Sequence, residues 1–134
     1  MPDSTVSPPG GALDTRGATA ARISTGAVQL LNEYTGRGPT KAQTIINGDS
    51  VAIVLQDTLT KGERQLVQAG LEDEVLNTRH AYQGVMKRDL VALVETQLER
   101  KVSAFLSANH AEPDVAVEFF LLEPLTGDGD GAAR

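Results

Sequence analysis

The sequence predicts one α+β domain, in which a mostly antiparallel four-stranded sheet carries its helices packed on one face. Three observations lead to this class: apolar residues at helical spacing, an Asn-Gly pair between two β-branched runs, and two more strand-like runs near the C-terminus. The predicted order is helix, hairpin, helix, helix, hairpin, which is typical of helices and strands in separate layers. A chain of 134 residues has room for one core.

Both ends of the chain are predicted to lie outside this core. Residues 1–16, which include Ser7-Pro8-Pro9-Gly10-Gly11, and residues 126–134, with their Gly/Asp alternation, offer few large apolar groups. Such segments cannot offset their ordering entropy by burial, so we expect a disordered N-terminal arm and a disordered C-terminal tail. The folded domain is expected to span residues 17–125.

The first half of the domain is predicted to be a helix followed by a hairpin. One helical face is apolar before Gly36, a natural helix stop, and its members are Ile23, Ala27, Leu30, Leu31 and Tyr34. Strands are expected at Lys41–Ile46 and Ser50–Gln56. They flank Asn47-Gly48-Asp49, where the Asn-Gly pair readily takes the positive φ angles of a tight turn.

The second half is predicted to be two helices followed by a second hairpin. Thr60 and Glu63 have capping-box spacing, and Gly70 can end a helix over residues 60–69. A longer helix over residues 71–97 carries an apolar stripe made of Val75, Tyr82, Met86, Leu90, Leu93 and Val94. Strands over residues 101–108 and 115–122 follow, joined by a polar loop with Pro113.

Composition excludes several classes of function. The chain has no Cys, which removes disulfides, thiolate nucleophiles and the common structural zinc sites. Its net charge of −6 repels phosphate backbones, so no nucleic-acid partner is expected. No apolar run approaches the ~18 residues of a spanning helix, and the N-terminus has no secretory signal pattern. We therefore expect a soluble cytoplasmic protein with no direct membrane insertion.

The segment Gly36, Arg37, Gly38 and Pro39 is one candidate binding site. Two glycines around an arginine can present backbone amides and a guanidinium to an anion. The same residues also make a plain helix stop and turn, and this interpretation is favoured because phosphate loops usually lie at a helix N-terminus.

Arg79 and Tyr82, one helical turn apart, form a second candidate site. Arg79 lies beside the apolar stripe, where a buried guanidinium needs a carboxylate or carbonyl partner or must extend to the surface. The candidate partners are Glu33, Glu95 and Glu118.

Catalysis and metal binding have little support in the sequence. The two histidines, His80 and His110, lie thirty residues apart, which is not metal-ligand spacing. If the protein were an enzyme of unrecognised type, its proton-transfer groups would be Tyr82, His80 and Glu95. We expect no catalytic residue, metal or cofactor.

Short segments spread along the chain together resemble one family. The likeness runs from about residue 23 to residue 122 and depends on the order and spacing of Glu33–Pro39, Leu59-Thr60 with Glu63, Arg79, Met86, Val94-Glu95, Arg100-Lys101-Val102, Pro113-Asp114 and Val117–Leu122. In these segments the chain resembles the family of the Na+-translocating membrane potential-generating system protein MpsC. It departs from the pattern at Leu98-Glu99, where the family has Thr-Gly before Arg-Lys-Val.

The resemblance implies a small soluble protein linked with a membrane system for cation transport, membrane potential and inorganic-carbon supply. We therefore expect a non-enzymatic accessory or regulatory module that docks on a protein partner, with membrane transport subunits as candidates. It would use its helical face or the Gly36–Pro39 corner. The alternative is a small-anion or nucleotide-binding domain using Arg37, Arg79 and Lys41. A homodimer is also expected, because helices on one face leave the other sheet face to bury.

Overall fold

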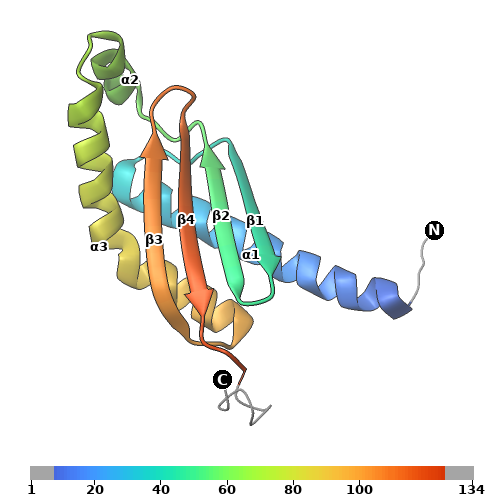
Figure 1. The fold of residues 1–134 in the computed structure, drawn as a ribbon. Coiled ribbons are helices and arrows are strands. Elements are labelled where there is room, and N and C mark those ends of the chain that lie inside the picture. The colour runs from blue at the N-terminus through green and yellow to red at the C-terminus, as the bar shows by residue number, and fades with distance from the viewer. Residues whose placement is uncertain (1–7, 126–134) are drawn as a thin grey trace.

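The computed structural model describes residues 8–125, with side chains from residue 16 onward, and has the predicted α+β class (Figure 1). Its elements follow the predicted order: α1 (Pro8–Thr35), β1 (Lys41–Asn47), β2 (Ser50–Gln56), α2 (Lys61–Gln68), α3 (Glu72–Leu98), β3 (Val102–His110) and β4 (Val115–Leu122). Within residues 8–125, no helix combines the length and the apolar character that crossing a membrane requires.

The first helix is longer than the sequence predicts. An arm is predicted up to residue 16, whereas α1 begins at Pro8. Proline is accepted in a first helical turn, so Pro8 is compatible with a helix that begins there. The other residues of the predicted arm, 1–7, and the predicted tail, 126–134, lie outside the described residues.

The four strands form one antiparallel sheet in the order β1-β2-β4-β3. In the first hairpin Asn47 pairs with Ser50, so the loop is only Gly48-Asp49 rather than three residues. Gly48 takes φ +61° at the first loop position, as a two-residue turn that begins with glycine requires. The second hairpin joins the C-terminal strands, and β4 lies in the middle of the sheet against β2.

Helices α1 and α3 pack on one face of this sheet and enclose the core between them (Figure 1). The alternating burial of β2 and β4 follows the pleat, since every second side chain of each strand points to the helices. The buried core consists of residues from both helices and both central strands: Ile23, Ala27, Leu31, Val51, Ile53, Leu55, Met86, Leu90, Val94, Ala116, Phe120 and Leu122.

The connection from α3 to β3 carries the departure from the family pattern. Glu99 ends the helix in the left-handed conformation, with φ +55°, and its N–H donates to the Glu95 carbonyl at 2.8 Å. Glycine adopts this conformation without steric cost, whereas a residue with a Cβ does not. The chain therefore makes this turn with glutamate in a strained position.

Candidate functional site

The Gly36–Pro39 segment forms the turn that brings the chain from α1 to the sheet. Gly36 has φ +82°, and its N–H donates to the Asn32 carbonyl at 2.8 Å, which closes the helix. Gly38 lies against α1, where an added Cβ would be 3.1 Å from a methyl carbon of Val28. Pro39 is buried. These contacts match the turn interpretation of the segment.

Arg37, Asp57, Arg64 and Asp114 meet beside this turn, and we call them the Asp57 cluster. The Asp57 carboxylate binds Arg37 Nη2 at 2.7 Å and Arg64 Nη1 at 2.8 Å, while Arg64 Nη1 lies 3.9 Å from Asp114 Oδ2. The hydrogen bond from Arg64, together with those from Thr40 and Arg37, lowers the pKa of Asp57 below its ordinary value. Asp57 therefore stays ionised at neutral pH.

Asp114 ties the β3–β4 loop to the chain between β2 and α2. Its Oδ1 accepts from the Thr58 hydroxyl and its Oδ2 from the Leu59 N–H, both at 2.9 Å. The Asp57 N–H donates to the Asp114 carbonyl at 3.1 Å. Segments far apart in the sequence are thus fixed at one end of the molecule, which makes this charged corner rigid.

Arg79 is buried under the same corner, with 3% of its surface exposed. It donates from Nε to Glu63 Oε2 at 3.0 Å and from Nη2 to Glu63 Oε1 at 2.6 Å, and Nη2 also donates to the Thr58 carbonyl. Glu63 Oε1 additionally accepts the Thr60 N–H at 2.8 Å, within the predicted capping box. One carboxylate thus caps α2 and neutralises the buried guanidinium.

This pairing differs from the partners that the sequence indicates for Arg79. Glu33, Glu95 and Glu118 are the candidates from sequence, but the partner is Glu63. The reason is tertiary: the capping box fixes the Glu63 side chain at the start of α2, and α2 packs against α3.

Arg37 and Arg79 therefore lie near one another in the fold without forming an open cationic pocket. Each is bound to a carboxylate, Asp57 or Glu63, and both also donate to backbone carbonyls of the segment after β2. Lys41 is exposed at the start of β1. An anion would have to displace Glu63 from Arg79 and would compete with Asp57 at Arg37, so this arrangement favours a structural role for both.

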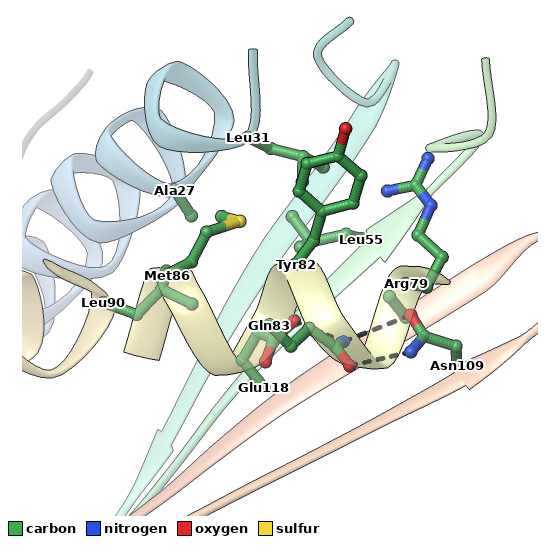
Figure 2. A pocket seen from close by; sticks show the side chains of 11 residues that line it. Ala27, Leu31, Leu55, Arg79, Tyr82, Gln83, Met86, Leu90, Asn109 and Glu118 are labelled. Atoms are coloured by element: carbon green, nitrogen blue, oxygen red, sulfur yellow. Dashed lines mark hydrogen bonds between the residues drawn. The ribbon is translucent and has the colours of Figure 1, made fainter. Parts of the chain in front are cut away.

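A second polar group lies inside the core next to Arg79 (Figure 2). Gln83 Nε2 donates to Glu118 Oε2 at 2.9 Å and to Asn109 Oδ1 at 3.1 Å, and Asn109 Nδ2 donates back to Gln83 Oε1 at 2.7 Å. The side-chain amides of Gln83 and Asn109 thus bond each other, and the second N–H of Gln83 Nε2 donates to the Glu118 carboxyl group. Gln83 and Glu118 are 6% and 3% exposed.

The Glu118 carboxyl group is only half satisfied by these contacts. Its Oε1 is buried without a hydrogen-bond partner among the described residues. Burial raises the pKa of the Glu118 carboxyl from 4.5 to about 7, although the hydrogen bond from Gln83 and the neighbouring Ser107 hydroxyl act in the opposite direction. Around neutral pH this group can therefore exchange a proton inside the core.

A small cavity adjoins this group. Its volume is about 10 Å³, which is close to the room that one water molecule needs. Most of its wall is apolar, with Leu31, Leu55 and Met86 among the lining residues, while Glu118 and Arg79 contribute polar atoms (Figure 2). The space suits a buried water and is too small for a nucleotide.

Tyr82 lines this cavity but is not brought together with the other predicted proton-transfer groups. Its hydroxyl points away from Gln83 in Figure 2. His80 is exposed on α3. Glu95 lies thirteen residues after Tyr82 on the same helix, which is about 20 Å at a rise of ~1.5 Å per residue. The Glu95 Oε2 accepts a hydrogen bond from the Val102 N–H at 2.8 Å.

Sequence reasoning missed Gln83, and it named Glu118 only as a candidate partner for Arg79 rather than as the buried partner of Gln83. A signal for Glu118 exists, because it shares the inward register of β4 with Ala116 and Phe120. On α3 the buried positions include Arg79 and Gln83 beside the predicted stripe residues Val75, Met86, Leu90 and Val94, whereas Tyr82, also predicted to be in the stripe, is half-buried. Among the described residues, no three acidic or histidine side chains gather as a metal site requires.

Comparison with known proteins adds one finding. The model of a family described as the Na+-translocating membrane potential-generating system (MpsC) matches residues 15–124. This range includes most of α1 and every other helix and strand. Neither a curated protein nor a solved structure matches the chain.

Proposed function

Because the chain belongs to the MpsC family, described as a Na+-translocating membrane potential-generating system, we propose that it is a non-enzymatic accessory module of such a system. The family match carries the proposal, since it spans the whole folded part rather than one motif. The description names a membrane system, and the module would act on it in the cytoplasm through a protein partner. The separation of Tyr82 from Glu95 supports the non-enzymatic part.

The surface proposed to contact this partner is the charged corner at Gly36–Pro39 and the Asp57 cluster. Arg37 and Arg64 have 32% and 43% of their side-chain surface exposed, and Asp57 has 36%. Both signs of charge are therefore held in fixed positions at the surface. Such a pattern provides orientation and specificity to a docking contact more than affinity.

The test is recovery of partners by the tagged full-length chain from detergent-solubilised membranes of the source cell, with mass spectrometry of the bound proteins. We expect subunits of a cation-transporting membrane complex. An Arg37→Ala, Arg64→Ala variant should lose them. A Lys87→Ala, Arg88→Ala variant, which removes the same charge from exposed positions on α3, should retain them.

The outcomes separate the two parts of this proposal. If both variants lose the membrane subunits, or if neither does, the contact surface is not the charged corner, but the accessory role still stands. Recovery of no membrane transport protein by the unaltered chain would refute the accessory role itself.

A further inference from the structure

The sheet face opposite α1 and α3 is formed by four rows of residues, each crossing the strands in the order β1, β2, β4, β3. The row at one end of the strands, Lys41–Gln56–Val115–His110, includes a lysine and a histidine. The other three rows are Gln43–Val54–Val117–Ala108, Ile45–Ala52–Phe119–Leu106 and Asn47–Ser50–Leu121–Ala104. We call these twelve residues the open face. In β2 and β4 they alternate with the buried positions that face the helices.

The open face is apolar and uncharged. Nine of its twelve residues are apolar, and the other three, Gln43, Asn47 and Ser50, carry no charge. The largest exposures are those of Leu106 at 64%, Ile45 at 47% and Leu121 at 41%. A contiguous exposed apolar patch of this kind marks an interaction surface.

We infer that the open face is covered by the open face of a second copy of this chain. Two chains of net charge −6 repel one another, so self-association requires contact through a surface without like charges. The open face meets this condition in all three rows. The charged corner and the acidic first turn of α3 do not.

Shape also favours a second copy. Sheets twist with one hand, so two identical faces pack with their strands aligned at about 30° and their side chains interdigitating. The central row alternates sizes in a way that suits this packing, because Ala52 lies between Ile45 and Phe119. A two-fold axis parallel to the strands, midway between β2 and β4, would place Ala52 of one copy against Phe119 of the other.

The available area is below that of a standard specific interface, so a dimer formed through this face should be weak. With strands ~4.8 Å apart and a rise of ~3.3 Å per residue, four strands of seven residues project about 440 Å² on each copy. The projected area of the two copies together is thus about 900 Å², without the extra surface that protruding side chains add. Specific interfaces begin near ~1,200 Å² of buried surface. Protruding residues such as Leu106 supply part of this difference.

The chain's own ends are poor candidates for the same role. Residues 1–7 and 126–134 contain only two large apolar side chains, Met1 and Val6. Two such residues cannot cover nine apolar positions. The inference does not depend on the proposed function, since a module of any kind could dimerise through this face.

The test is the mass of the full-length chain in solution by sedimentation equilibrium, at about 1 to about 200 µM, where a small interface forms and dissociates. We expect the mass to rise with concentration from 14.2 kDa to twice that value. Leu106→Lys places two like charges in the interface and should raise the dimer Kd at least tenfold.

The matched control is Val85→Lys, because Val85 on α3 is also 64% exposed and receives the same charge. It should leave the Kd unchanged. Circular dichroism of each variant confirms that the fold persists, and Leu121→Thr, a change compatible with a strand, provides a second disruption. A mass of 14.2 kDa at every concentration overturns the inference. So does a dimer whose Kd is the same in Leu106→Lys and Leu121→Thr as in the unaltered chain.

Discussion

Among the described residues, Glu118 is the carboxyl group buried in the core without a cationic partner, and Glu118→Gln removes it. Its Oε2 accepts from Gln83, and its Oε1 has no partner among the described residues. Glutamine has nearly the same shape and can still accept from Gln83, but it cannot ionise. The comparison of the two proteins across pH therefore isolates the free energy of ionising Glu118 in the core.

The direction follows from the raised pKa of Glu118. Below pH 4.5 the carboxyl is protonated in both the folded and the unfolded chain. As the pH rises from 4.5 to about 7, the unfolded chain ionises while the folded chain keeps its proton, so the free energy of unfolding falls. Above about pH 7 both states are ionised and the loss is complete. A pKa difference of 7 − 4.5, at about 1.36 kcal/mol per unit, gives a loss of about 3 kcal/mol.

The assay is urea unfolding of both proteins between pH 4 and pH 8 at constant ionic strength. Relative to Glu118→Gln, the original chain should lose about 3 kcal/mol of unfolding free energy across this range, because all other groups titrate in both proteins. Glu123→Gln is the control, since Glu123 is exposed and this change should give a flat difference. If the difference in unfolding free energy between Glu118→Gln and the original chain is also independent of pH, then the pKa of Glu118 is not raised by burial.

Three further predictions concern stability, each measured by urea unfolding at neutral pH. Arg79→Met removes a buried guanidinium and leaves the partly buried Glu63 carboxylate without its partner, which should cost about 3 kcal/mol. Arg37→Met in the more exposed cluster should cost about 1 kcal/mol or less, and equal costs would contradict this difference in burial. Glu99→Gly relieves the left-handed conformation and should stabilise by about 0.5–1 kcal/mol, with any loss arguing against strain there. Gly84→Ala, with open space around the new Cβ, should stabilise α3 by about 1 kcal/mol, while Gly26→Ala brings a Cβ to 2.6 Å from a leucine methyl group and should yield no such gain.

The sequence was sufficient for the elements and their order because these depend on local periodicity and turn chemistry. Ser50–Gln56 and Val115–Leu122 are strands with the predicted bounds, and the Thr60 capping box starts α2 as predicted. The start of α1 was not predicted, because Pro8, Pro9, Gly10 and Gly11 are residue types of low helix propensity.

The candidate site was predicted only in part. Local sequence identified the Gly36–Pro39 turn and the need of Arg79 for a partner, but not which carboxylate supplies it. That choice depends on how α2 packs against α3, which no local pattern encodes. The same holds for Glu118, whose environment arises when β4 enters the middle of the sheet and faces Gln83.

By itself, then, the sequence determined the α+β class, the two hairpins, the helix caps and the resemblance to the MpsC family, since all of these are carried by short spacings and residue types. Only the tertiary structure decided that Arg37 and Arg79 are paired with Asp57 and Glu63. It also decided that a carboxyl group lies half-satisfied in the core and that twelve uncharged residues form one open face. These features join residues far apart in the chain, and the free energy of pairing or exposing a side chain depends on what packing places beside it.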